Sequence, residues 1–221
     1  MSLANVLQYN LEQSGYNVTL SHDGQDAINQ ARLKLPEIIL LDVMIPVFDG
    51  LEVCKRLRAI PETQGSVIVL LTAKSDESDQ LVGFNVGADD YVVKPFSVKI
   101  LLERLKALDR RRKAQSGFEN EVISVGGISI DRMKHRVTID GNPIDLTPSE
   151  FRLLETLIRQ PGRAFDRTEL IDAALGEDTL VLERTIDVHI RSLRKKLGPN
   201  ADSIQTVRGI GYRFRETVTS E

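Results

Sequence analysis

The chain has 221 residues, of which 41% are apolar and 28% are charged, with a formal net charge of −3. This composition is ordinary for soluble globular domains, and the length predicts about two of them. No run approaches the roughly 18 apolar residues of a membrane span, no signal peptide is visible, and the single cysteine excludes an internal disulfide, so we expect a cytoplasmic protein with no membrane partner.

The first half of the chain alternates between helical and strand-like patterns. Apolar residues recur at helical spacing in segments 3–14, 27–35, 51–60, 78–87 and 97–110. Short strands are expected at 17–21, 37–42, 66–73 and 90–94. Two of these strands are continuously apolar, as in strands that are buried on both faces. The alternation predicts a parallel sheet with helices on both sides.

A charged and polar stretch around residues 110–121 separates this half from the next, and we place the linker itself at 113–121. Short strands are then expected at 122–125, 128–131 and 135–140, with "DGNP" as a turn. Helices follow at 147–158, 166–175 and 182–197, and a hairpin of two strands ends the domain at 204–214. The first two of these helices begin with capping boxes, formed by Thr147 with Glu150 and by Asp166 with Glu169.

Three polar residues end apolar strands of the expected parallel sheet: Asp42, Thr72 and Lys94. Chemistry collects at the carboxyl ends of such strands. A carboxylate, a hydroxyl and an ammonium that meet there could accept a phosphoryl group, with the carboxylate attacking and the other two groups binding the phosphoryl oxygens. The alternative is that each residue only terminates its strand, but the presence of three at one edge favours a site.

The helix at 182–197 combines an apolar stripe with a basic face. Ile186, Ile190, Leu193 and Leu197 form the stripe and should face the core. The other side carries Thr185, Val188, His189, Arg191, Ser192, Lys195 and Lys196. Residues 184–215 hold eight basic residues against two acids, as expected of a helix that enters the major groove of DNA. A solvated basic face is the alternative, but a hairpin with Thr206, Arg208 and Tyr212 around two glycines favours DNA.

These motifs resemble a known family. "IILLDVMIPVFDGLEVCKRLR", "VIVLLTA" and "GADDYVVKPF" resemble the receiver domain of bacterial two-component response regulators, over residues 1–112. "LTPSEFRLLETLI", "RTIDVHIRSLRKKLG" and "TVRGIGYRF" resemble the winged-helix DNA-binding domain of the OmpR/PhoB subfamily, over residues 122–217. The resemblance implies an α/β fold with a flavodoxin-like doubly wound parallel sheet, followed by an α+β winged-helix domain.

The resemblance also implies roles for residues. Asp42 would be the phospho-acceptor, Thr72 the switch hydroxyl, Tyr91 the switch aromatic, and Lys94 a phosphoryl contact. The contacts implied for promoter DNA are Arg184, Thr185, Val188, His189, Arg191, Ser192, Arg194, Lys195, Thr206, Arg208 and Tyr212. A homodimer formed on activation would use Asp89, Asp90, Arg104 and Arg111. The further partners would be a sensor histidine kinase and, through segment 175–183, RNA polymerase.

One part of the family pattern is missing from the chain. Receivers begin with a strand that ends in two acids, and these acids bind Mg²⁺ together with the phospho-acceptor, here Asp42, and a carbonyl, here that of Met44. The chain begins inside the first helix, so we expect a receiver without its first strand, an incomplete Mg²⁺ site and poor phosphorylation. Either the chain is shortened at its N-terminus, or the receiver is degenerate and the protein is a constitutive DNA-binding regulator. An aspartyl-phosphate enzyme is disfavoured because position 44 is not an acid.

Overall fold

The computed structural model describes residues 3–73, 86–114, 122–174 and 184–216. These residues belong to two compact units, Met1–Asp109 and Arg110–Glu221, and each unit has its own secondary structure and core. In the described part of the chain, every helix is too short or too polar to cross a membrane.

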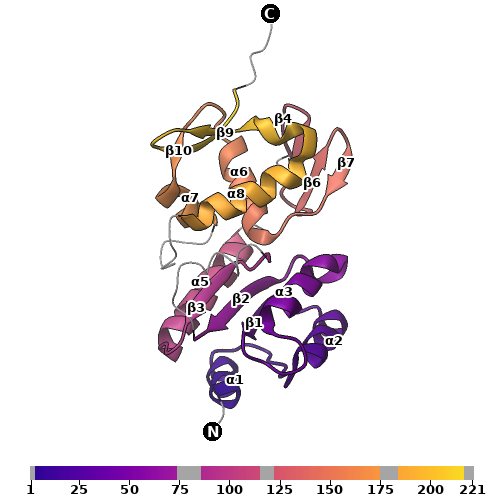
Figure 1. The fold of residues 1–221 in the computed structure, drawn as a ribbon, viewed down its shortest axis with the longest axis vertical. Coiled ribbons are helices and arrows are strands. Elements are labelled where there is room, and N and C mark those ends of the chain that lie inside the picture. The colour runs from indigo at the N-terminus through magenta and orange to yellow at the C-terminus, as the bar shows by residue number, and fades with distance from the viewer. Residues whose placement is uncertain (1–2, 74–85, 115–121, 175–183, 217–221) are drawn as a thin grey trace, which may run out of the picture. The chain divides into compact units, whose positions relative to one another are not determined.

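The first unit is a parallel α/β layer structure (Figure 1). Its elements are α1 (Leu3–Gln13), α2 (Gly24–Lys34), β1 (Ile38–Asp42), α3 (Gly50–Ala59), the 3-10 helix η1 (Pro61–Thr63), β2 (Val67–Thr72), β3 (Asp90–Val93) and α5 (Val98–Ala114). The strands pair in parallel in the order β1-β2-β3. The expected alternation of helices and parallel strands is therefore confirmed, although most of the helix expected at 78–87 lies outside the described residues.

The central strand β2 is buried along its whole length, as its continuous apolar run predicts. Val67, Val69 and Leu71 join a core cluster to which α1 and α5 also contribute buried leucines. The alternate residues Ile68 and Leu70 point to the opposite face of the sheet and are fully buried as well. Strand β2 is therefore buried on both of its faces, and its single polar residue, Thr72, ends the strand.

Two expectations for this unit were wrong. Residues 17–21 form no strand, although Val18 still packs against the core. A strand needs a hydrogen-bonding neighbour, and no described segment pairs with these residues. Helix α5 also continues through Ala114, beyond the end of this unit at Asp109 and beyond the expected start of the linker at residue 113. Arginine and lysine are good helix formers, so the charged run after residue 109 extends the helix instead of ending it.

The second unit is an α+β domain with antiparallel strands. Its elements are β4 (Val122–Val125), β5 (Ile128–Asp131), β6 (Arg136–Ile139), β7 (Asn142–Ile144), α6 (Pro148–Ile158), β8 (Phe165–Asp166), α7 (Arg167–Ala174), α8 (Arg184–Leu197), the 3-10 helix η3 (Gly198–Ser203), β9 (Ile204–Val207) and β10 (Gly211–Phe214). One sheet has the order β4-β5-β6-β7 and the other the order β8-β10-β9. Strand β7 was missed in the sequence because it begins inside the "DGNP" turn and is only three residues long.

One apolar core joins the helices of this unit to both of its sheets. The stripe predicted on α8 is confirmed, because Ile186, Ile190, Leu193 and Leu197 are at most 1% exposed. The capping box of Thr147 and Glu150 is present at the start of α6. Asp166 and Glu169 form the second box at α7, since each accepts a backbone N–H from the other. These caps fix where the helices begin, and the stripe fixes which face of α8 is left outside.

Candidate phosphoryl-acceptor site and nucleic-acid interface

Asp42, Thr72 and Lys94 lie together at the carboxyl edge of the parallel sheet. Asp42 is opposite Leu71 in the ladder and Thr72 is opposite Val93, so the three residues end adjacent strands. The ammonium of Lys94 is ion-paired with Oδ2 of Asp42, and the backbone N–H of Met44 donates to Oδ1 at 3.0 Å. The Asp42 side chain is 30% exposed, whereas Thr72 is buried. The edge thus offers one accessible carboxylate with a cation beside it.

The loop after β1 packs closely against the strand that it leaves. A Cβ on Gly50 would collide with the carbonyl oxygen of Asp42, so only glycine lets α3 begin this close to the site. The backbone N–H of Gly50 also donates to the carbonyl of Val43 at 3.0 Å. Val47 has φ +71°, an uncommon conformation for a β-branched residue, and its side chain is exposed. Asp42 is therefore followed by a short, constrained turn.

The donors at this edge do not fit Mg²⁺. The ion needs near-octahedral ligation by oxygen. The expected ligands, Asp42 and the carbonyl of Met44, supply one carboxylate and one carbonyl, and Lys94 already engages one oxygen of that carboxylate. Among the described residues, no group of three or more His, Cys, Asp or Glu side chains is placed to hold a metal ion.

The dimer residues expected from sequence are mostly engaged inside the chain. Asp89 has a fully buried side chain that pairs with Arg58, and its Oδ2 also accepts the backbone N–H of Ile68 at 2.9 Å. Its assignment to an exposed dimer face was therefore wrong. Asp90 is also buried and lies 3.4 Å from Arg104 of the same chain. Arg111 is on α5, but its side chain lies outside the described residues.

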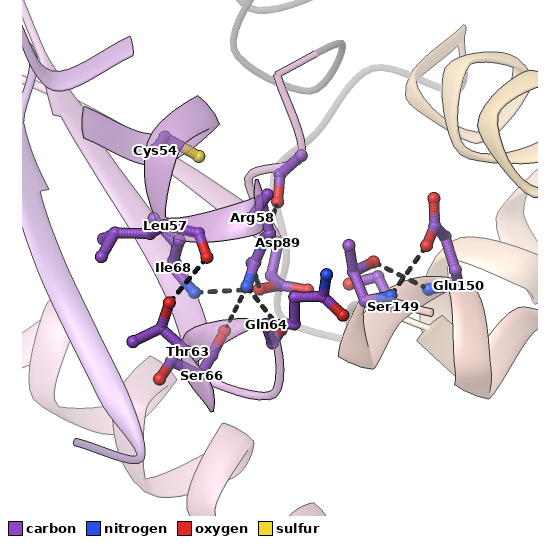
Figure 2. A network of polar contacts seen from close by, with 12 residues as sticks. Cys54, Leu57, Arg58, Thr63, Gln64, Ser66, Ile68, Asp89, Ser149 and Glu150 are labelled. Carbon is purple, nitrogen blue, oxygen red and sulfur yellow. Dashed lines mark hydrogen bonds and ion pairs between the residues drawn. The ribbon is translucent and has the colours of Figure 1, made fainter. Parts of the chain in front are cut away.

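Arg58 is the centre of a network of polar contacts in this unit (Figure 2). Its guanidinium donates to the carbonyls of Gly87, Gln64 and Ser66 at 2.7–2.8 Å, and to Asp89 at 2.5 Å. The network joins α3 to the turn before β2 and to the residues that lead into β3. Because β3 carries Tyr91 and ends just before Lys94, the network fixes the strand that brings these residues to the site. Tyr91 itself is buried.

Only part of the expected DNA-binding face of α8 is on the surface. Arg191 and Lys195 are exposed and Val188 is half-buried. Thr185 and His189 are buried, so their assignment as DNA contacts was wrong. Each precedes a residue of the apolar stripe, and the buried face of α8 is one residue wider than that stripe. Arg184 begins the helix, but its side chain lies outside the described residues.

Other polar side chains of α8 bind the domain itself. Ser192 Oγ donates to the buried carboxylate of Glu150 at 2.5 Å, and Lys196 Nζ donates to it at 2.7 Å. Arg194 donates to the carbonyl of Ile204 at 2.8 Å and to Thr206 Oγ1 at 2.9 Å. The acid of the α6 capping box therefore also positions α8, a role that the capping motif alone did not reveal.

The hairpin β9–β10 presents Thr206 and Arg208 on the surface but not Tyr212. The side chain of Tyr212 is 6% exposed, and its hydroxyl donates to Asp187 Oδ1 at 2.8 Å. Its assignment as a DNA contact was therefore wrong, because the ring packs into the core and the hydroxyl is engaged. The sequence predicted no role for Asp187, although an acid four residues before Arg191 is unusual in so basic a helix.

Comparison with known proteins finds a matching domain family for each of the two units. Residues 2–106 match the response regulator receiver domain, and residues 141–214 match the C-terminal domain of transcriptional regulatory proteins. The phosphate regulon transcriptional regulatory protein PhoB of Rhizobium meliloti is 44% identical over 96% of this chain and 93% of its own. The response regulator ArlR of Staphylococcus saprophyticus is 39% identical over 97% and 95% of the two chains.

A solved structure extends the likeness to the whole fold. A mutant of RitR superposes with a TM-score of 0.79 at 28% identity, covering 97% of this chain and 95% of that one. The relatives named above are regulators, which confirms the expectation of a regulator instead of an enzyme. The chain belongs to the OmpR/PhoB family of two-component response regulators, with a receiver domain followed by a DNA-binding domain.

Proposed function

We propose that the protein regulates transcription by binding promoter DNA under the control of phosphorylation at Asp42 by a sensor histidine kinase. The observation that carries this proposal is the partly exposed Asp42 carboxylate at the end of β1, with the Lys94 ammonium against it. We place the protein in the cytoplasm, where it would meet both the chromosome and the kinase.

The chemistry proposed for the site is a single phosphoryl transfer. An oxygen of Asp42 forms a bond to the phosphorus of a phosphohistidine while the P–N bond breaks, and the imidazole leaves with the electron pair of that bond. Lys94 remains an ammonium and exchanges its contact with the carboxylate for one with a phosphoryl oxygen. Thr72 and Tyr91, on the neighbouring strands, are the proposed switch residues that respond to the new charge.

The proposed output is a change in how two copies associate on DNA. Phosphorylation favours a homodimer, which places two winged-helix domains on neighbouring half-sites. Arg104 and Arg111 are the proposed dimer residues that remain after the two buried acids, Asp89 and Asp90, are removed from the set. On DNA, the contacts are made by residues at the surface of α8 and the hairpin: Val188, Arg191, Lys195, Thr206 and Arg208. RNA polymerase is the proposed downstream partner, through segment 175–183, which lies outside the described residues.

The test is to incubate the full chain with acetyl phosphate and to locate the added phosphoryl group by peptide mass spectrometry. We expect modification of Asp42, slow because the metal donors are few, and no modification in Asp42→Asn. Asp49→Asn, which changes an exposed helix-capping acid in the same loop, is the matched control and should be modified as the wild type is. A phosphoryl group on another residue, or equal labelling of Asp42→Asn, would contradict the proposal.

The poor donor set for Mg²⁺ favours a second candidate, a regulator that binds DNA without phosphorylation. In that case the wild type would stay unmodified after prolonged incubation, and its affinity for DNA would not respond to acetyl phosphate. The two candidates share the winged-helix domain and differ only in the receiver.

A further inference from the structure

A cluster of charged and aromatic side chains fastens the hairpin β9–β10 to α8. Asp187 is in the first turn of α8, and its Oδ1 accepts from the Tyr212 hydroxyl at 2.8 Å and from Arg167 Nε at 2.9 Å. One carboxylate oxygen therefore joins three elements: α8, β10 and the start of α7. Arg167 also reaches the hairpin turn, where its guanidinium lies 3.5 Å from the carbonyl of Ile210.

Two arginines enclose the Tyr212 ring. The guanidinium of Arg167 is 5.6 Å from the ring centroid and that of Arg194 is 5.5 Å from it, both within cation–π range. Burial and the bond to Asp187 raise the pKa of the Tyr212 hydroxyl, so it stays a donor at neutral pH. The cluster is thus a satisfied network on the side of α8 that faces the hairpin.

Asp187 would oppose DNA binding if it were free. It lies one helical turn before Arg191 and two turns before Arg194, so a bare carboxylate there would repel phosphates. Its side chain is 40% exposed and that of Arg167 is 28% exposed, so the pair is close to the surface. The guanidinium of Arg167 compensates the negative charge of Asp187. The carboxylate therefore repels phosphates less, and it holds the Tyr212 hydroxyl of the hairpin.

The anchor sits at the base of the element that carries Arg208. Tyr212 is opposite Thr206 in the hairpin, and Gly211 is opposite Val207, which leaves residues 208–210 as the exposed turn. Strand β8 also pairs with β10 at Gly211 and Tyr212, and Arg194 links β9 to α8, so the Asp187 bond is one of several contacts that hold the base of the hairpin. The Asp187 bond is the contact that ties the Tyr212 side chain to α8, so we expect its removal to loosen the turn relative to α8.

We propose that Asp187, Tyr212 and Arg167 are positioning residues that set the hairpin turn relative to α8, so that Arg208 meets a DNA phosphate beside the groove entered by α8. The inference rests on the proposed DNA binding and deepens it. These three residues act through Arg208 and need not touch DNA.

The test exploits the salt dependence of binding. Each phosphate contact adds about one to the slope of log K against log [salt], because it releases a counterion. Tyr212→Phe removes one hydroxyl and no charge, and it keeps the ring against both arginines. We expect this variant of the full chain to bind a duplex enriched from a random-sequence pool about tenfold more weakly, with a slope smaller by about one.

Several variants separate positioning from general destabilisation. Tyr9→Phe removes the hydroxyl of an exposed tyrosine in α1 and should change neither affinity nor slope. Arg208→Ala should add nothing further in the Tyr212→Phe background, whereas Lys195→Ala should lower affinity equally in both backgrounds. Asp187→Ala is the second variant, for use if Tyr212→Phe does not fold. If Asp187 acted only through its negative charge, Asp187→Ala would tighten DNA binding. If Asp187 positions the hairpin, as we propose, the same variant should bind DNA more weakly.

The outcomes are distinct. A smaller slope in Tyr212→Phe, with the effect of Arg208→Ala abolished, supports the inference. An unchanged slope, or additive effects of Tyr212→Phe and Arg208→Ala, would overturn it while leaving DNA binding intact. Failure of the wild-type chain to enrich any duplex would overturn the proposed DNA binding, and this inference with it.

Discussion

Replacing Arg58 by methionine should severely destabilise the receiver unit. The Arg58 side chain is 9% exposed and pairs with Asp89, whose side chain is fully buried. Methionine has a similar apolar stem but offers no donors. The variant therefore takes the guanidinium away from a buried carboxylate, and it removes a donor from the carbonyl oxygens of Gly87, Gln64 and Ser66.

The size of the effect follows from the burial of the pair. Removing one partner of a buried ion pair costs about 3–5 kcal/mol, because the remaining charge loses its compensation. Arg56 provides the matched control, since it is two residues away on the same helix and its ion pair with Glu52 is 40–43% exposed. An exposed pair of this kind contributes about 0–1 kcal/mol, so Arg56→Met should have a small effect.

Hydrogen exchange at the amides of β2 and β3 reports the stability of this unit separately from the other. We expect exchange in Arg58→Met to accelerate about 10²–10⁴-fold, and exchange in Arg56→Met to change by less than about tenfold. Adding Asp89→Asn to Arg58→Met should recover part of the loss, because it removes the buried charge. Equal exchange in the two arginine variants would refute the role assigned to the network.

Four further predictions concern other parts of the chain. Leu193→Ala, at the fully buried centre of the α8 stripe, should lower the free energy of unfolding of the second unit by about 2–5 kcal/mol in denaturant titration, and a loss below about 1 kcal/mol would contradict the core assignment. Burial raises the pKa of the Cys54 thiol to about 12, so the native protein should resist alkylation at pH 8 and react only after unfolding; fast labelling of the folded chain would contradict this. Burial lowers the pKa of His135, so its neutral form favours the folded state; the second unit should lose stability as pH falls below about 6.5, and His135→Asn, which suits the φ of +49°, should reduce that loss. Arg191→Ala should lower the salt slope of DNA binding by about one, whereas Lys196→Ala should lower it less because Glu150 already holds that ammonium; equal effects would argue against the ion pair.

The regular elements could be predicted because local signals and burial agree. Continuous apolar runs indicated the buried parallel strands, and capping residues placed the starts of α6 and α7. The strand expected at 17–21 failed because pairing is not a local property: its alternating residues suit a strand, yet no described neighbour pairs with them. The predicted end of α5 at residue 110 was wrong for the opposite reason. A charged run is typical of a linker, but its arginines and lysine also favour a helix, and the helix continues through Ala114.

For the candidate sites, the sequence predicted which strand ends come together, but it did not predict which polar side chains are buried. The grouping of Asp42 with Lys94 could be predicted, because the register of a parallel sheet brings strand ends together. The state of individual polar side chains could not. Asp89, His189 and Tyr212 look like surface contacts in the sequence, but long-range partners or burial place them inside. Helical periodicity identifies the centre of a buried face and not its width, so residues at its margin are assigned only by the packed structure.

The most direct test of the central claim is the affinity of the full chain for an enriched DNA duplex before and after incubation with acetyl phosphate, measured in parallel for the wild type and for Asp42→Asn. Phosphorylation control predicts that the wild type binds more tightly once Asp42 is modified, and that the variant does not respond. An identical response of the two proteins, or no response in wild-type protein that is shown to be modified at Asp42, would contradict the account.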